Sequence, residues 1–433
     1  MGLFGSEAAP PAASPVPPQL ADVYKHLLTL KGKSEANALT NNLASAILAQ
    51  SVRDGASDVH FDPHDDMIAV RFRIDGELRD KLSFSRKDFA VTAQFRVMSG
   101  FSPQAATSFS PEDGAFSLDI DQRPVRFRVS AFPTIYGDKL VIRLLDSGAS
   151  ALTLDTLGFT PESLKTLKAA IASPSGIFFV CGITGGGKTT TLCSIVTALQ
   201  KPSINIMTLE DPVEYVLPHV IQSNINPKAG FNFADGLRSI LRQDPNIIML
   251  GEVRDAETAE IAMRAALTGH LIFSTIHTIS TVGIITRLTD MGIPPFLTAE
   301  SMIGALAQRL VRKICAQCAA PVEPSANHFN YLVQALPPEE AKAVVAEATA
   351  PGGTYLVGRG CPACNMTGYK GRTGIFELLT LTRPLRELIA AKTPLAELRR
   401  GAISSGLQTL LMDGIRKARA GITTLNEIAR VLG

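Results

Sequence analysis

The fold of this chain is decided by Gly176-Ile-Phe-Phe-Val-Cys-Gly-Ile-Thr-Gly-Gly-Gly-Lys-Thr-Thr-Thr191. The stretch contains the pattern G-x-x-x-x-G-K-T, in which glycines let backbone N–H groups turn toward phosphate oxygens. Lys188 can reach the β/γ-phosphates of a nucleotide, and the Thr189 hydroxyl can bind Mg²⁺. The apolar run 177–180 predicts a buried strand, and residues 190–199 predict a helix. A chance glycine-rich turn is the alternative, but the strand and helix on either side favour a nucleotide-binding loop.

Three later apolar segments each run into an ionisable residue, which is Glu210, Glu252 and His277 in chain order. Strands alternate with helices from Leu152 to about Leu310, so an α/β domain with a mostly parallel sheet is expected. Open α/β sheets bind ligands at the carboxyl ends of their strands, where an acid can serve Mg²⁺ or orient water. One acid alone could cap a helix, and a lone histidine is more often structural. Two acids after a phosphate loop favour a hydrolytic site.

Arginines alternate with apolar residues in the part of the chain that precedes the phosphate loop. Residues 37–54 predict an amphipathic helix, and Val70-Arg-Phe-Arg-Ile74 has the period of two that a half-buried strand requires. Arg128 and Arg143 lie in two further segments of this kind. Such arginines are most often solvated, and the alternative is that they reach a phosphate or a neighbouring subunit. An α+β domain with arginines along a sheet is therefore predicted.

Four of the six cysteines form two Cys-x-x-Cys pairs, Cys315 with Cys318 and Cys361 with Cys364. Four reduced thiolates in two such pairs suit tetrahedral Zn²⁺. Redox-active pairs and cysteines without metal are the alternatives. Turn-like sequence around the second pair, outside the nucleotide-binding core, favours structural zinc.

Composition narrows the class of protein. The chain is 45% hydrophobic and 19% charged, which is typical of a packed globular protein, and its net charge of +2 is unlike that of most nucleic-acid binders. No apolar run approaches the ~18 residues of a membrane span, and the N-terminus has no signal-peptide pattern. A cytosolic protein with reduced cysteines is therefore expected. Residues 1–36 are rich in Ala and Pro and predict a disordered tail.

Taken together, the chemistry-bearing stretches resemble the ATPases of type II secretion systems and type IV pilus assembly, and the resemblance covers residues 37–433. With the phosphate loop, the stretches that carry it are Ala56-Ser-Asp-Val-His-Phe-Asp-Pro63, Val70-Arg-Phe-Arg-Ile-Asp-Gly76, Ile206-Met-Thr-Leu-Glu-Asp-Pro-Val-Glu214, Leu241-Arg-Gln-Asp-Pro-Asn-Ile-Ile-Met-Leu-Gly-Glu-Val-Arg-Asp255 and Ala266-Leu-Thr-Gly-His-Leu-Ile-Phe-Ser-Thr-Ile-His-Thr278. The later three look like the aspartate box, Walker B segment and histidine box of that family.

The resemblance implies an α/β fold with a RecA-like P-loop ATPase core, a smaller preceding α+β domain of PAS-like type, a zinc knuckle and C-terminal helices. The implied division after the tail is 37–147 for the N-terminal domain, 148–312 for the core, 313–372 for the zinc-binding subdomain and 373–433 for the helical subdomain. The tetracysteine pattern resembles the assembly branch of the family and is unlike the retraction ATPases.

The resemblance also implies roles for individual residues, with ATP, Mg²⁺ and Zn²⁺ as ligands. Glu252 is implied as the Walker B glutamate and Glu210 as the aspartate-box acid, His277 contacts the γ-phosphate, and Arg128 and Arg143 reach the nucleotide. The implied phosphate cradle consists of Gly182, Thr184, Gly185, Gly186, Gly187, Lys188, Thr189 and Thr190. The chain departs from the family pattern at Ile183, Gly186 and Ile279, where Pro, Ser and Asn are usual. The first two departures remove no phosphate contact, and the third bears on a local hydrogen bond.

Members of that family form ring hexamers, so the resemblance implies a homohexamer that acts on an inner-membrane platform protein and on cytoplasmic domains of the machine. It implies a cytoplasmic protein that is peripheral to the inner membrane and has no direct nucleic-acid partner. The alternatives are a nucleic-acid translocating RecA-like motor and a scaffold that does not hydrolyse ATP. Near-neutral charge and only 6% aromatic residues disfavour the first. Intact Lys188, Glu210 and Glu252 disfavour the second.

Overall fold

The computed structural model describes residues 20–31, 36–102, 110–145, 153–323, 332–334 and 336–433. The chain divides into two units, Met1–Asp146 and Ser147–Gly433. The finer five-part division expected from the sequence stays a prediction.

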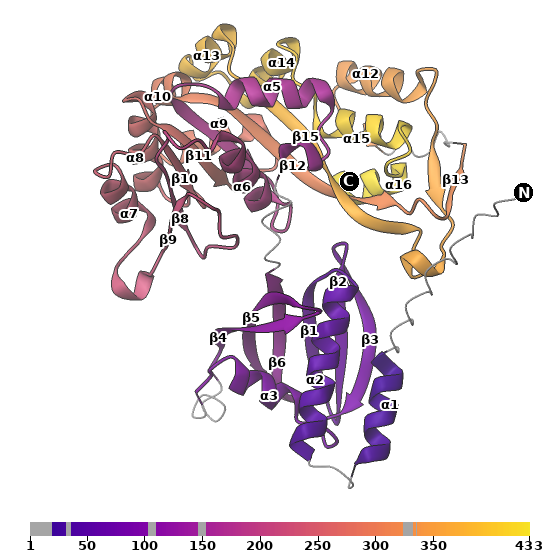
Figure 1. Ribbon diagram of the computed structural model, residues 1–433. Coiled ribbons are helices and arrows are strands. Elements are labelled where there is room, and N and C mark those ends of the chain that lie inside the picture. Colours follow the sequence, from indigo (N-terminus) through magenta and orange to yellow (C-terminus); the bar gives the residue numbers. More distant parts are fainter. Residues whose placement is uncertain (1–19, 32–35, 103–109, 146–152, 324–331, 335) are drawn as a thin grey trace, which may run out of the picture. The chain divides into compact units, whose positions relative to one another are not determined.

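The first unit is an antiparallel sheet with the strand order β3-β2-β1-β6-β5-β4, packed against helices (Figure 1). Its strands are β1 (Ala56–His64), β2 (Met67–Ile74), β3 (Glu77–Ser85), β4 (Glu112–Ile120), β5 (Arg123–Thr134) and β6 (Gly137–Leu145). Its helices are α1 (Leu20–Leu30), α2 (Ala36–Arg53) and α3 (Val91–Met98). This is the α+β organisation that the sequence predicts.

The predicted alternation along β2 is confirmed. Val70, Phe72 and Ile74 are buried and share one apolar core with Leu43 of α2, whereas the intervening Arg71 is only partly buried. Because successive side chains of a strand point to opposite faces, the arginines lie on the face that the core does not use.

Helix α1 corrects the expectation of a disordered tail for residues 20–30. Leu20 and Leu27 are buried in the core of the first unit, and Tyr24 packs against the rings of Phe84 and Phe89. Apolar residues at positions 20, 23, 24, 27 and 28 have helical spacing, a signal that the neighbouring Ala/Pro-rich stretch obscured. Residues 1–19 of the expected tail lie outside the described part of the chain.

The second unit contains a seven-stranded sheet with the order β15-β12-β7-β11-β10-β8-β9 (Figure 1). All neighbouring strands are parallel except β12 and β15, which are antiparallel. The strands are β7 (Gly176–Cys181), β8 (Ile206–Glu210), β9 (Ile221–Asn224), β10 (Ile247–Leu250), β11 (Leu271–Ile276), β12 (Met302–Ile314) and β15 (Tyr369–Thr380). A small second sheet pairs β13 (Ala319–Pro321) with β14 (Leu356–Gly358).

Helices cover both faces of the large sheet, which explains why its central strands are continuous apolar runs. All six residues of β7 are buried, and they alternate between two cores, since Ile177 and Phe179 belong to one and Phe178 and Val180 to the other. The helices of this unit are α5 (Pro161–Ile171), α6 (Lys188–Leu199), α7 (Phe233–Ile240), α8 (Ala256–Leu267), α9 (Thr281–Asp290), α10 (Pro295–Ser301), α12 (Pro338–Thr349), α13 (Arg383–Ala390), α14 (Leu395–Ser404), α15 (Leu410–Arg419) and α16 (Leu425–Leu432).

Elements that follow residue 312 in the chain pack back against the large sheet of the second unit. Strand β15 pairs along β12 and crosses the expected boundary at residue 373 between the zinc-binding and helical subdomains. Helix α12, within the insert between the two cysteine pairs, is fastened to α15 because Glu347 accepts hydrogen bonds from Arg416 at 3.2 Å and Arg419 at 2.5 Å. The C-terminal helices expected within residues 373–433 are α13 to α16.

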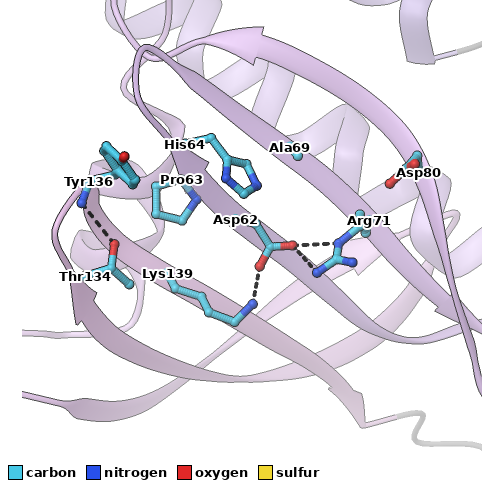
Figure 2. A pocket seen from close by; sticks show the side chains of 9 residues that line it. All are labelled: Asp62, Pro63, His64, Ala69, Arg71, Asp80, Thr134, Tyr136 and Lys139. Atoms are coloured by element: carbon cyan, nitrogen blue, oxygen red, sulfur yellow. Dashed lines mark hydrogen bonds and ion pairs between the residues drawn. The ribbon is translucent and has the colours of Figure 1, made fainter.

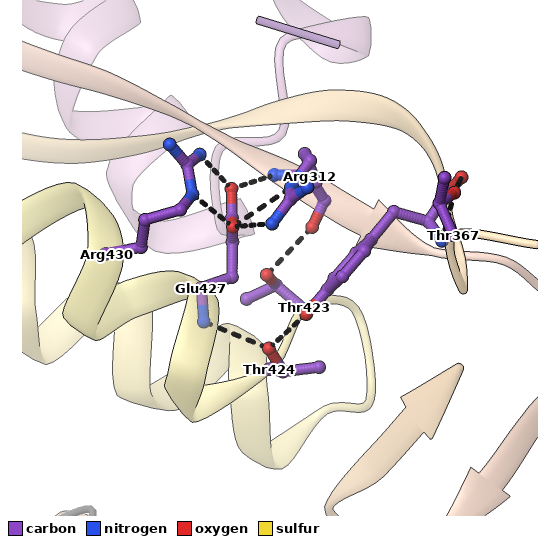
Figure 3. Close-up of polar contacts among 7 residues, drawn as sticks. Arg312, Thr367, Thr423, Thr424, Glu427 and Arg430 are labelled. Atoms are coloured by element: carbon purple, nitrogen blue, oxygen red, sulfur yellow. Dashed lines mark hydrogen bonds and ion pairs between the residues drawn. The ribbon is translucent and has the colours of Figure 1, made fainter. Parts of the chain in front are cut away.

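A buried carboxylate attaches the last helix to the sheet (Figure 3). Glu427 of α16 accepts two hydrogen bonds from the Arg312 guanidinium of β12, at 3.0 and 2.7 Å, and two from Arg430. The Arg312 guanidinium also lies 4.2 Å from the centre of the Tyr369 ring. This cluster connects β12, β15 and α16 next to the cysteine pairs.

Candidate active site

The phosphate loop lies between β7 and α6, as predicted. Gly187 takes a left-handed conformation with φ of 85° and precedes α6, whose first residue is Lys188. The Lys188 ammonium donates to the carbonyls of Gly182 at 2.9 Å and Ile183 at 3.1 Å. Burial lowers the pKa of Lys188, and the charge of Glu252 acts in the opposite direction. A lysine, a helix N-terminus and loop amides therefore converge at one end of the sheet, an arrangement that suits phosphates.

The remaining residues of the predicted cradle lie in the same loop and in the first turn of α6. Gly185 also has a left-handed backbone, with φ of 74°, and the Gly186 amide closes a turn onto the Ile183 carbonyl at 3.1 Å. Thr189 and Thr190 lie in the first turn of α6, and the Thr190 hydroxyl is 3.4 Å from the Tyr215 hydroxyl. Thr184 lies in the loop itself.

Glu252 and His277 meet at the carboxyl edge of the same sheet. The His277 Nε2 atom lies 3.1 Å from Glu252 Oε2, and Arg254 donates to Glu252 Oε1 at 2.5 Å. Arg254 also lies 3.4 Å from the Asp211 carboxylate. The hydrogen bond from Arg254 lowers the pKa of Glu252, so this carboxylate is held in its charged form beside the lysine of the loop.

Backbone contacts fix the ends of these strands relative to one another. The Thr275 hydroxyl donates to the Gly251 carbonyl at 2.6 Å, the Val253 amide donates to the Thr275 carbonyl at 2.9 Å, and the Gly251 amide donates to the Leu209 carbonyl at 2.7 Å. The positions of Glu252 and His277 are thus set by main-chain hydrogen bonds as well as by their own contact.

Glu210 ends β8 as predicted, but its carboxylate is held differently from that of Glu252. It is 2% exposed and accepts hydrogen bonds from Thr208 at 2.7 Å and from Gln222 of β9 at 2.9 Å. Burial raises the pKa of Glu210. The two acids therefore occupy distinct environments, one buried and polar and one partly open and paired with cations.

The two N-terminal arginines lie together in the first unit. Arg128 of β5 pairs in register with Arg143 of β6, which pairs with Asp58 of β1, so the three side chains share one face. Arg143 donates to the buried Asp58 carboxylate at 3.0 Å, and both arginines are exposed.

Sequence reasoning brings the four paired cysteines together, and so does the structure. Their sulfur atoms all lie within 4.8 Å of one another, with 3.8 Å between Cys315 and Cys361 and 3.9 Å between Cys318 and Cys364. A tetrahedral zinc with Zn–S distances of about 2.3 Å places its sulfur ligands about 3.8 Å apart, so the cluster fits this metal. Burial acts against ionisation of the Cys364 thiol, but hydrogen bonds from the backbone amides of Cys361 and Gly368 lower its pKa to about 6.

The other two cysteines are core residues, as expected. Burial raises the pKa of both Cys181 and Cys193 to about 12, so neither is a reactive thiolate near neutral pH.

A cavity of about 440 Å³ lies in the first unit, apart from these groups (Figure 2). Asp62 occupies its centre between Lys139 and Arg71, whose Nη2 atom is 2.6 Å away. Hydrogen bonds from these two cations outweigh the effect of burial and lower the pKa of Asp62. The two cations of the lining are matched in number by two carboxylates, Asp62 and Asp80, so the cavity has no surplus positive charge that would attract phosphate.

Sequence reasoning missed Gln308 and Arg309, two buried polar residues of β12 that touch the phosphate loop. Their signal was the interruption of an otherwise apolar strand by two polar residues. It also missed that Arg254 links Asp211 to Glu252, although all three residues stand in the quoted motifs. Among the described residues, no helix has the length and hydropathy needed to cross a membrane.

The chain is similar in sequence to a known family and to characterised proteins. The family described as "Type II/IV secretion system protein" matches residues 33–430. The Type II secretion system ATPase E of Vibrio cholerae is 41% identical over 400 residues, which cover 92% of this chain and 76% of that protein. The Type IV pilus assembly ATPase PilB of Thermus thermophilus is 38% identical over 418 residues, which cover 95% of this chain and 46% of that protein.

The fold has a counterpart among solved structures. The X-ray structure of the Legionella pneumophila ATPase DotB aligns with a TM-score of 0.66 at 21% identity and covers 91% of this chain and 95% of that one. This likeness confirms the predicted fold class, a RecA-like α/β core preceded by a smaller α+β domain.

Proposed function

Because the chain belongs to the type II/IV secretion system protein family and is an ATP-hydrolysing enzyme, we propose that it is the motor that drives assembly of a type IV pilus or of a type II secretion pseudopilus. The observation that supports a hydrolytic motor is the contact of Glu252 with His277 at 3.1 Å, at the sheet edge that also carries Lys188. The motor acts in the cytoplasm on an inner-membrane platform protein and works as a homohexamer.

In this proposal the phosphate loop binds ATP and the strand ends hydrolyse it. Backbone amides of the loop and Lys188 bind the phosphates. Thr189 and Glu252 would hold Mg²⁺, and the ion would neutralise charge on the phosphates. Glu252 orients the attacking water, since its carboxylate stays ionised beside Arg254. His277 hydrogen-bonds the γ-phosphate and reports its loss to the rest of the protein. Glu210, buried and held by Thr208 and Gln222, supports the same water from the β8 side.

We assign Arg128 and Arg143 to the nucleotide as well. Two exposed guanidinium groups paired in register present cationic charge in one place, which suits the charge that develops on a transferring phosphoryl group. Asp58 orients Arg143 through their hydrogen bond. Turnover by mixed rings, in which one subunit carries R128Q/R143Q and the other a Lys188→Ala loop, tests whether these arginines act on a neighbouring subunit's nucleotide.

The four cysteines are proposed to hold one structural Zn²⁺. The metal would tie the end of β12 to the start of β15 and so close the insert that carries α12. This role is structural, because all four ligand positions belong to the protein.

Glu252→Gln tests the hydrolytic assignment. The amide keeps the size of the side chain but coordinates Mg²⁺ poorly and cannot accept a proton from water, so ATP affinity should stay within about threefold while kcat falls about 100-fold or more. Glu260→Gln is the matched control, because Glu260 lies on the exposed surface of α8 with 49% of its side chain accessible. Turnover by E252Q within threefold of the unaltered protein would contradict the assignment.

A second measurement tests the motor assignment. Purified cytoplasmic domains of an inner-membrane platform protein should raise kcat, and single-stranded DNA should leave it unchanged. Stimulation by DNA alone would favour the nucleic-acid motor instead.

A further inference from the structure

Two consecutive polar residues of β12 form the floor beneath the phosphate loop. Ala307 of β12 pairs with Cys181, the last residue of β7, so Gln308 and Arg309 continue past the end of β7 alongside the loop. Both are nearly inaccessible, at 2% and 6% exposure. Burying an amide and a guanidinium is unfavourable unless their hydrogen bonds are satisfied, so their partners indicate what they do.

Gln308 contacts the loop and the helix that follows it. Its side-chain oxygen accepts a hydrogen bond from the Thr191 hydroxyl at 2.6 Å. The backbone carbonyl oxygen of Gln308 lies 2.6 Å from the point where a Cβ atom would stand on Gly182. Its side-chain Nε2 atom lies 2.7 Å from the corresponding point on Gly187. The first and last glycines of the loop therefore rest on one residue of β12.

Arg309 extends this contact to the segment that carries the histidine. Its Nη1 atom donates to the Gln308 carbonyl at 3.0 Å, and its Nη2 atom donates to the Ile279 carbonyl at 3.4 Å. Ile279 follows His277 by two residues. Among the described residues, no carboxylate lies within 4 Å of this guanidinium, so main-chain carbonyls are its hydrogen-bond partners.

The other end of the same segment is fastened by a second buried charge. Glu377 of β15 is 3% exposed and accepts hydrogen bonds from the Thr281 amide at 2.9 Å and the Thr281 hydroxyl at 2.6 Å. Residues 279–281 are thus held at one end by Arg309 and at the other by Glu377. The His277 side chain is 56% exposed, so its position depends on this backbone segment and on Glu252.

We propose that Arg309 is a positioning residue for ATP hydrolysis, which ties the segment after His277 to the floor of the phosphate loop. The inference rests on the proposed function, since it requires that His277 contact the nucleotide. Without the hydrogen bond from Arg309 to the Ile279 carbonyl, ATP stays bound but the His277 imidazole is no longer held at the γ-phosphate. A displacement of about 1 Å in an active site can lower the rate about 100-fold.

A double-mutant cycle on the full-length protein tests this proposal. Arg309→Met should lower kcat about 10- to 100-fold and change the KM for ATP and the Kd for ADP less than about threefold. His277→Asn should also lower kcat, and the double variant should be no slower than the slower single one, because both changes remove the same contact. Arg309→Lys keeps the positive charge and can still donate to one of the two carbonyls, so it should recover part of the rate. It replaces R309M if that variant does not fold.

The matched control is the double variant R312M/E427Q, which alters a largely buried arginine three positions along the same strand, with 11% of its side chain exposed. Its kcat should stay within about twofold, and its effect should multiply with that of H277N. The proposal is overturned if R309M and H277N multiply, if H277N leaves kcat unchanged, or if R309M weakens ADP binding as much as it lowers kcat. Failure of the proposed function would instead appear as undiminished turnover by E252Q.

Discussion

Two arginines bind the same carboxylate of α16, and their burial predicts very different energetic roles. Glu427 has no exposed side-chain surface, whereas the side chains of Arg312 and Arg430 are 11% and 48% exposed. Truncating one member of a buried ion pair costs about 3–5 kcal/mol, because the other charge stays buried without it. Half-exposed pairs contribute only about 0.2–1 kcal/mol, since water screens them.

We therefore expect Arg312→Met to destabilise the attachment of α16 by about 3 kcal/mol or more and Arg430→Met by at most about 1 kcal/mol. A change of about 1.4 kcal/mol is a factor of ten in an equilibrium constant. The population of molecules in which α16 is detached should therefore rise more than about 100-fold in R312M and at most about fivefold in R430M. Amide hydrogen exchange over residues 425–432 measures this population directly.

Adding E427Q to R312M should restore part of the protection, because a neutral amide is less costly to bury than a carboxylate whose remaining partner, Arg430, is half-exposed. Burial acts to raise the pKa of Glu427, but hydrogen bonds from the two arginines lower it overall. The stabilisation should thus be complete above the ordinary glutamate pKa and be lost as pH falls through the lowered value. Equal exchange in R312M and R430M, or a rise below tenfold in R312M, would refute the reasoning from burial.

Three further outcomes are expected. Gly182→Ala should lower the melting temperature more than Gly185→Ala, because both residues have positive φ but only the first would place a Cβ within 2.6 Å of a backbone carbonyl. Arg254→Gln removes a hydrogen bond that lowers the pKa of Glu252, so the carboxylate should become protonated at a higher pH. The acid limb of the pH profile of kcat should therefore move to higher pH, and an unmoved limb would contradict this. Cys361→Ser should remove about one equivalent of zinc, measured by metal analysis, and a metal-free parent protein would contradict the zinc assignment.

Local signals in the sequence were sufficient for the loop and for much of the secondary structure. The phosphate loop, the period of two in β2 and the C-terminal helices each depend on residues close together in the chain, and all were found where expected. The placement of Glu210, Glu252 and His277 at one sheet edge also followed, because parallel strands carry their carboxyl ends to the same side.

Contacts between distant parts of the chain were decided only by the tertiary structure. Pairing of β15 with β12 joins residues that lie 55 (Ile314 and Tyr369) to 76 (Gly304 and Thr380) positions apart in the chain. Gln308, which lies under the loop, contacts Thr191 across 117 positions. No local periodicity encodes which strands become neighbours or how far one extends beyond another, since that depends on which apolar faces pack together. The sequence by itself therefore determined which ionisable groups stand at the carboxyl ends of the parallel strands, and the packing of β12 against β7 decided which buried polar residues lie beside the phosphate loop.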